Sequence, residues 1–255
     1  YDTGDTSINA PKSFKVSKNA SGELTAIFDG VEYAFKPSDR VVESNGESYG
    51  YELRDANGDY VAGMFSYTGE LDEVMDTRSD DYVAILNLQR RLENGVNDNA
   101  FGVFGSEAPE DVFAGGGQAS YDTFMRINLV PTTGFQSNTE SRRGLRGDGT
   151  FDVDFAAGTV GGSISNLTLQ EPQSSVRTPG AGSVEFATTT LTSDGFSGTV
   201  AGDAGANALV GGTLTGTYEG GLFGPNGEQI AGATSVSTAG ATEQVGSGYF
   251  EGRID

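Results

Sequence analysis

The sequence contains no cysteine and no histidine among its 255 residues. Without cysteine, disulfides, thiol catalysis and cysteine-bound zinc are excluded, although this absence does not fix the compartment. Without histidine, Ser-His-Asp and Cys-His catalysis, histidine-ligated haem and the usual zinc and copper sites are excluded as well. Many hydrolase and metal chemistries are therefore ruled out before any motif is considered.

Long apolar runs are also missing. Hydrophobic residues make up 36% of the chain, and no run of them reaches the length that a membrane-spanning helix needs. The sequence begins at Tyr1 with no signal-peptide pattern, so we expect a mature or trimmed form of the protein. The length is sufficient for one large or two small domains.

Basic side chains are scarce. Lys and Arg number 15 against 36 Asp and Glu, which gives a formal net charge of −21, and the acidic excess runs through both halves of the chain. Such a surface repels phosphate backbones and anionic lipids, so we do not expect nucleic-acid binding. The charge would attract basic partners; plain solubility or adaptation to a salty medium would explain it equally well.

Glycine, by contrast, is abundant, and its use changes along the chain. Residues 1–100 contain 9 glycines and residues 101–255 contain 30. High glycine together with many Thr and Ser predicts an all-β protein of short strands and tight turns. We place a domain boundary in the polar run at residues 94–100. The expected parts are a flexible leader (1–13), a small antiparallel β domain (14–100) and a larger β domain (101–255).

The small β domain is predicted from short runs of strand-forming residues joined by turn residues. Its Asp55-Ala-Asn-Gly-Asp59 run has oxygen ligands at alternate positions, as calcium loops do, but it lacks the later bidentate Glu of an EF-hand. An Asn-Gly turn explains the run without a metal. The expected strands are residues 14–16, 24–28, 31–35, 49–54 and 60–67, with an Asp29-Gly30 hairpin between the second and the third.

Residues 78–94 fit either a helix or a strand. A helix would gather Ile85, Leu88 and Leu92 on one face, whereas a strand would place Leu86 and Leu88 on the same side. Periodicity leaves both possibilities open.

The larger domain is predicted to be an eight-stranded antiparallel up-and-down β-barrel. An even number of evenly spaced strands suits a closed barrel, which has no free edge. In its first strand, the odd-numbered residues from Ala119 to Leu129 face one way, and Ser120, Asp122, Arg126 and Asn128 face the other. The expected strands are residues 118–129, 150–156, 160–169, 183–191, 196–201, 209–223, 229–236 and 247–254.

Two charged groups in this domain are candidate sites. Asp152 and Asp154 could act as a carboxylate pair, but two residues apart on a strand they are expected to form its wet face. Arg142, Arg143 and Arg146 lie in the polar run 131–147, interpreted as a long loop, and could receive a carboxylate or phosphate of a partner. The alternative is that these arginines pair with nearby Asp and Glu. We predict no catalytic residues and no metal site.

Three motifs in the larger domain resemble one family. The entry of its barrel is similar to residues 101–105, 109 and 117–121. Its Val-Asp-Phe-x-x-Gly-Thr-Val-x-Gly hairpin is similar to residues 153–162. Its Phe-Tyr-Gly-Pro-x-Ala-x-Glu-x-Gly-Gly signature is similar to residues 222–232. The family is that of transferrin-binding protein B and related surface lipoproteins. The sequence departs from these motifs at four positions: Thr123, Gly227, Gln229 and Ala231.

The resemblance implies a function and a setting. Residues 14–100 would correspond to the family's "handle" domain, and the family has a strand near Asp81-Tyr-Val83, which favours a strand at residues 78–94. It implies a non-enzymatic bacterial surface binding protein without a cofactor, at the outer membrane, at the cell surface or secreted. Such a protein would capture a protein partner or a solute of the iron or haem type for an outer-membrane uptake system. Its only link to the membrane would be a lipid anchor upstream of Tyr1.

The sequence leaves the ligand and the type of function open. Because the chain has no histidine, haem would need a Tyr or Met ligand here. The interior of a small barrel is either filled with side chains or encloses a cavity for a ligand. A structural or adhesive role, such as a fibre or vesicle-coat subunit, fits the composition as well as capture does.

Overall fold

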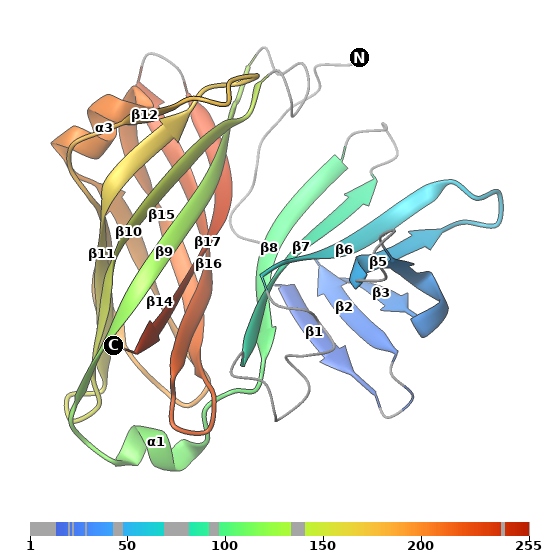
Figure 1. Ribbon diagram of the computed structural model, residues 1–255, viewed down its shortest axis with the longest axis horizontal. Helices are drawn as coiled ribbons and strands as arrows, with labels where there is room; N and C mark the ends of the chain where they lie inside the picture. Colours follow the sequence, from blue (N-terminus) through green and yellow to red (C-terminus); the bar gives the residue numbers. More distant parts are fainter. Residues whose placement is uncertain are drawn as a thin grey trace. The chain divides into compact units, whose positions relative to one another are not determined.

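Figure 1 shows the computed structural model of the chain, which is all-β with a few short helices. The structure describes residues 14–19, 21, 23–28, 30–42, 48–68, 82–91, 97–133, 141–240 and 243–254. The expected leader, residues 1–13, lies outside these ranges. The chain divides between Ser106 and Glu107 into two compact units, which are treated separately below.

The N-terminal unit contains a three-stranded and a five-stranded antiparallel sheet. The predicted strands are present, with a shared core of side chains such as Phe28, Phe35, Met64 and Leu86. The three-stranded sheet is formed by β1 (Phe14–Lys18), β2 (Leu24–Phe28) and β3 (Val31–Phe35), and the short 3₁₀ helix η1 (Pro37–Asp39) follows it. The five-stranded sheet is formed by β4 (Arg40–Val42), β5 (Ser48–Arg54), β6 (Tyr60–Thr68), β7 (Val83–Arg91) and β8 (Asn97–Gly105).

Two expectations for this unit can be compared with the structure. Within residues 78–94, the strand interpretation is confirmed for β7 (Val83–Arg91), whereas residues 78–81 and 92–94 lie outside the described ranges. The linker expected at residues 94–100 is wrong from Asn97 onward, because β8 begins there and pairs with β7. Its polar residues join the sheet through backbone hydrogen bonds, which need no apolar side chains. Residues 101–105, expected at the barrel entry, belong to this strand too.

The C-terminal unit is a closed eight-stranded antiparallel barrel, as predicted. Each strand pairs with the next along the chain, and β9 closes the ring by pairing with β17. The short β12 (Arg177–Pro179) is an addition on the edge of β11. The eight barrel strands are β9 (Gln118–Pro131), β10 (Arg143–Asp154), β11 (Thr159–Gln170), β13 (Val184–Thr190), β14 (Phe196–Gly202), β15 (Gly212–Phe223), β16 (Gln229–Gly240) and β17 (Gln244–Ile254).

Aromatic side chains fill the middle of the barrel. Phe151 stacks on Phe250 with ring centroids 4.6 Å apart and lies 4.9 Å from Phe186. Tyr218 packs edge-on against Phe186 at 5.1 Å, and Phe196 lies 6.0 Å from Tyr218. These rings come from strands all round the barrel, so side chains occupy the space at this level.

A short helix covers each end of the barrel (Figure 1). At one end lies α1 (Glu110–Ala114), whose Val112 and Phe113 pack against the core. At the other lies α3 (Ala204–Val210), whose Ala206 and Val210 are fully buried.

The helix α3 corrects the strand predicted at residues 209–223, because Leu209 and Val210 are helical and β15 begins only at Gly212. Its ends carry local signals. The Asp203 side chain accepts a hydrogen bond from the backbone N–H of Ala206, and Gly211 adopts the left-handed conformation (φ 81°) that ends helices.

The long loop expected at residues 131–147 is also shorter than predicted. β9 runs to Pro131 and β10 already begins at Arg143. Glycines hide the alternation in the first half of β10, and the neighbouring strand leaves no room for a side chain at two of them, Gly147 and Gly149. A Cβ atom on Gly149 would lie only 2.0 Å from the Ser163 carbonyl oxygen of the neighbouring strand.

The turn predicted at Gly224-Pro-Asn-Gly227 is present between β15 and β16. The Gly227 N–H donates to the Gly224 carbonyl at 3.1 Å, and both glycines have positive φ. The Tyr121 hydroxyl donates a 2.6 Å hydrogen bond to the Gly227 carbonyl from inside the barrel, which fixes the turn to β9. Among the described residues, no helix is long and apolar enough to cross a membrane.

Candidate functional site: two arginine clusters on the barrel

The three arginines predicted as a partner-binding group do not form one cluster. Arg142 is exposed just before β10, whereas Arg143 and Arg146 lie on β10 itself. Residues three apart on a strand point to opposite faces of a sheet. Arg143 therefore faces the end of the barrel under α3, and Arg146 faces outward.

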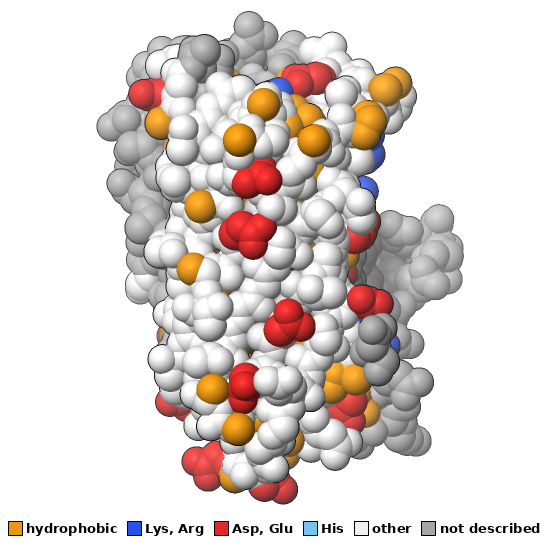
Figure 2. Space-filling model, turned by 90° about the vertical axis from the view of Figure 1, so that its left-hand side faces the viewer, with side chains coloured by type: hydrophobic (Ala, Val, Ile, Leu, Met, Phe, Trp, Pro, Cys, Tyr) orange, Lys and Arg blue, Asp and Glu red, His pale blue; other side chains and the backbone are white. Residues whose placement is uncertain are grey.

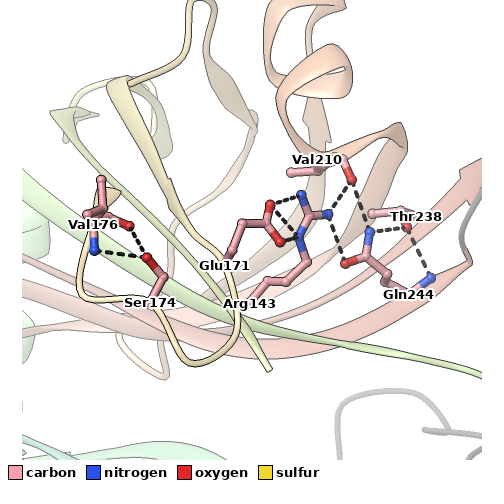
Figure 3. Close-up of polar contacts among 7 residues, drawn as sticks. All are labelled: Arg143, Glu171, Ser174, Val176, Val210, Thr238 and Gln244. Atoms are coloured by element: carbon pink, nitrogen blue, oxygen red, sulfur yellow. Dashed lines mark hydrogen bonds and ion pairs between the residues drawn. The ribbon is translucent and has the colours of Figure 1, made fainter. Parts of the chain in front are cut away.

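Arg143 is held in a polar network at this end of the barrel (Figure 3). Its Nε–H is shared between the two carboxylate oxygens of Glu171, at 3.1 and 3.2 Å, and its Nη2 donates to Glu171 Oε1 at 2.7 Å. Its Nη1 donates to the Val210 carbonyl at 2.7 Å and to Gln244 Oε1 at 3.3 Å. Gln244 Nε2 donates to the same carbonyl at 3.0 Å and to Thr238 Oγ1 at 3.4 Å.

This network fastens α3 to the barrel. The carbonyl of Val210, the last residue of α3, has no partner within the helix, and a cation at a helix C-terminus is favourable. Arg143 supplies that cation, while the buried Gln244 satisfies the same carbonyl from β17. Each of the three guanidinium nitrogens of Arg143 thus donates to a partner within the chain, and Glu171 is the acidic partner in its ion pair.

Arg146 belongs to a different cluster on the outer wall. Cross-strand register places it opposite Arg126 of β9, and Arg126 in turn lies opposite Tyr249 of β17. Arg177, on β12, influences both arginines electrostatically. The Arg146 guanidinium also lies over the ring of Phe124, 6.0 Å from its centroid. We call Arg126, Arg146 and Arg177 the wall arginines.

The wall arginines repel one another. Burial lowers the pKa of Arg146, and the charges of Arg126 and Arg177 lower it further. Burial and the charge of Arg126 likewise lower the pKa of Arg177. In the part of the chain that the structure describes, no carboxylate forms an ion pair with Arg146 or Arg177. Elsewhere the barrel is acidic: Figure 2 shows red side chains scattered over one wall and blue ones only at its margins.

Sequence reasoning missed two of the three wall arginines. Arg126 was placed on the outward face of its strand, but nothing in the sequence indicated which residue would lie opposite it. Arg177 follows a loop after β11, and no local pattern marks it. Of the six basic residues after position 100, three therefore meet on one patch of wall although they are far apart along the chain.

The acidic candidate residues accept hydrogen bonds from groups nearby in their own turn or sheet. Asp55 accepts the backbone N–H groups of Asp59 (2.9 Å) and Asn57 (2.8 Å), and these bonds lower its pKa; this is the geometry of a turn. Asp152 accepts from Ser120 at 2.7 Å on the exposed face of β10. Within the described residues, no three acidic side chains come together as a metal site would require.

No protein-family model matches the sequence, and no curated protein does.

Solved structures do match. The isotype 1 transferrin binding protein B of serogroup B Neisseria meningitidis shares 20% identity over 91% of this chain (TM-score 0.45). A double mutant of the same protein from Haemophilus parasuis shares 13% identity over 96% of this chain, with a TM-score of 0.50. The chain has the fold of transferrin binding protein B.

The likeness to transferrin binding protein B concerns the fold alone, because sequence identity is low. The chain spans 39% of the N. meningitidis protein and 45% of the H. parasuis protein. It also matches an intact transferrin binding protein B with N and C lobes at 16% identity and a TM-score of 0.48, spanning 43% of it. The chain is therefore less than half as long as each of these proteins.

Proposed function

We propose that the chain is a non-enzymatic bacterial surface protein that captures a protein partner on the outside of its barrel. The observation that carries this proposal is the filled interior of a barrel with the transferrin binding protein B fold. Phe151, Phe186, Phe250 and Tyr218 occupy the space that a solute would need. A fold does not determine a function, so the packed interior is what favours a macromolecular partner over haem or another small solute.

The similar structures guide the choice of partner and location. They are named for binding transferrin, so transferrin is the first partner to test. The protein would act at the outer membrane or cell surface or after secretion, in an uptake system. A lipid anchor upstream of Tyr1 would provide its link to the membrane. Absence of histidine and cysteine from the chain agrees with a role without catalysis.

A structural or adhesive role is the competing proposal. Closed barrels offer no free strand edge for self-association by strand pairing, and the C-terminal unit is such a barrel. For the barrel unit, this favours capture over assembly by strand pairing.

Binding and self-association can be measured together. The purified chain is immobilised for biolayer interferometry against iron-loaded and iron-free transferrin, and titrated separately with haemin by absorbance. Analytical ultracentrifugation of the same sample reports self-association. Saturable transferrin binding by a monomer, with no stoichiometric haemin band, is expected. One haemin bound per barrel, or a ladder of oligomers without partner binding, would contradict the proposal.

A further inference from the structure

We propose that the wall arginines Arg126, Arg146 and Arg177 form a binding site for a compact dianionic oxyanion of the phosphate or sulfate class. The proposal rests on the geometry of the barrel wall and does not depend on the function proposed above. No such site follows from the likeness to transferrin binding protein B, which extends only to the fold.

The site consists of two rows of side chains that run across neighbouring strands on the outer wall. The pairing of the strands places two arginines in the first row. Arg126 on β9 and Arg146 on β10 are direct cross-strand partners. Side chains opposite one another on the same face of an antiparallel pair are close neighbours, and like charges there are destabilising. Arg146 lies opposite Thr168 on its other side, so a hydroxyl continues the row on β11.

The second row leaves an opening beside the arginines. It runs from Asn128 on β9 through Gly144 on β10 to Gln170 on β11 and ends at Arg177 on β12. Among the residues that the structure describes, a Cβ atom on Gly144 would meet only Gln170 atoms, at 3.8 and 3.9 Å. The centre of this row therefore has no side chain, and polar groups surround it.

Unsatisfied donors and acceptors lie in these two rows. Arg146 Nε, Arg177 Nη1 and Asn128 Oδ1 are buried and, in the part of the chain described, have no hydrogen-bond partner. Buried polar atoms are normally paired, so such orphans need an explanation. The side-chain amide of Asn128 can turn to present its NH₂ group, since the two amide orientations are nearly indistinguishable.

One side of the site is already fixed. Arg177 donates through Nη2 to Gln170 Oε1 at 2.6 Å, and Gln170 is held in turn by a hydrogen bond from its Nε2 to the Ser174 carbonyl. Arg177 is thus oriented before any ligand arrives, and its Nη1 remains for a ligand. Preorganised donors reduce the entropy lost on binding.

An oxyanion would satisfy both the charge and the hydrogen bonds. A guanidinium presents a planar fork of donors that matches the oxygens of phosphate, sulfate and carboxylate groups. Among the described residues, Arg146 and Arg177 have no carboxylate partner, and two such cations favour a dianion over a single carboxylate, because a dianion offsets more of their mutual repulsion. The net charge of −21 makes general attraction of anions to this protein unfavourable, so any binding must come from this local site.

Inorganic phosphate is the probe for the test. Isothermal titration calorimetry and thermal unfolding are run with phosphate, with sulfate and with chloride at equal ionic strength. Phosphate and sulfate are expected to bind with one-to-one stoichiometry and to raise the Tm of the barrel, while chloride does not. Arg146→Gln and, separately, Arg177→Gln are expected to weaken phosphate binding about tenfold or more, as the loss of one charge-assisted contact implies.

The matched control is Arg142→Gln. Arg142 is exposed, lies just before the same strand and has no place in the two rows, so its variant is expected to bind phosphate as the original chain does. Circular dichroism establishes that each variant is folded, and the use of two site variants covers the failure of either one to fold.

The outcomes separate the sources of the anion. A phosphoserine peptide that binds more tightly than free phosphate would identify a group carried on a larger molecule, and equal affinity would identify the free ion. The proposal is overturned if phosphate and sulfate act no differently from chloride, or if Arg142→Gln weakens binding as much as Arg146→Gln does. Transferrin binding is unaffected by these results, so this proposal and the proposed function can fail independently.

Discussion

The packed barrel interior makes a quantitative prediction for Phe151→Ala. The Phe151 ring is fully buried and lies within 4.6 to 6.2 Å of the rings of Phe250, Phe186 and Tyr218. Removing such a ring costs about 3–5 kcal/mol. We expect the upper part of this range, because strands of a closed sheet are restrained from collapsing into the space and because each aromatic pair adds about 0.5–1.5 kcal/mol.

Calorimetry provides the assay. For a domain of this size, each kcal/mol shifts Tm by about 2–4 °C, so a loss of about 4–5 kcal/mol should lower the barrel transition by roughly 8–20 °C, while that of the N-terminal unit stays in place. The variant should also gain saturable binding of benzene or xenon, as apolar cavities do. Val176→Ala is the control: Val176 is 70% exposed, so its change should stay within about 0.5 kcal/mol.

One result would refute the reasoning. If Phe151→Ala costs less than about 1 kcal/mol, a typical value for an unremarkable substitution, and the unmodified chain already binds benzene, then the interior is not close-packed. The argument that a partner must bind outside the barrel would then fail as well.

Three further predictions concern the barrel ends. Arg143→Leu should destabilise the barrel by about 1.5–3 kcal/mol, the worth of hydrogen bonds to a charged group, whereas Arg142→Leu should have little effect in the same urea titration. Tyr121→Phe loses a buried 2.6 Å hydrogen bond, worth about 0.5–1.5 kcal/mol at pH 7. Burial, followed by the charge of Glu228, raises the pKa of Tyr121 from 10.0 to about 12, so its contribution is present below pH 10 and lost as pH rises toward 12; Tm against pH should show a smaller alkaline loss in the variant. Burial raises the pKa of Glu228, but hydrogen bonds from the backbone and side chain of Asn226 outweigh it and bring the pKa below 4.5. The stability from Glu228 is therefore present above pH 4.5 and lost as pH falls through the folded pKa, and Glu228→Gln should flatten this acid limb of the Tm profile; an unchanged limb would contradict the assignment.

Alternation of side chains made most of the fold predictable. Six residues of β9 were predicted to share one face. Ala119 is partly buried, and the other five, Tyr121, Thr123, Met125, Ile127 and Leu129, are buried. A half-buried strand has to alternate in this way, because successive side chains point to opposite faces. The eight-stranded barrel followed from the number and spacing of such runs, together with the family motifs.

The errors arose where local pattern and tertiary structure diverge. Leu209 and Val210 have strand-like neighbours, but the cap at Asp203 and the left-handed Gly211 enclose a helix instead. The start of β10 is rich in glycine because the neighbouring strand approaches closely at Gly149, and glycine carries no side-chain pattern. Asn97, at the start of β8, is polar in sequence yet belongs to a strand by its backbone pairing.

The arginine clusters show what sequence proximity cannot reveal. Arg143 and Arg146 are three residues apart, and the strand sends them to opposite sides of the sheet. Arg126 meets Arg146 only because β9 and β10 pair in one register, and β12 must fold back on β11 to bring Arg177 near. Such non-local pairing depends on the whole barrel, so the wall arginines could not be predicted from the spacing of the residues.

The seam between β9 and β17 has a consequence for biosynthesis. These two strands are the first and the last of the barrel in sequence, and they pair along eleven residues from Gln244 to Ile254. A ribosome releases β9 long before β17, so the ring cannot close while the chain is still emerging. Until then the nascent barrel has two unpaired edges, which are sites of aggregation. Proteolytic loss of β17 would restore those edges, so the barrel's solubility depends on its last strand staying attached.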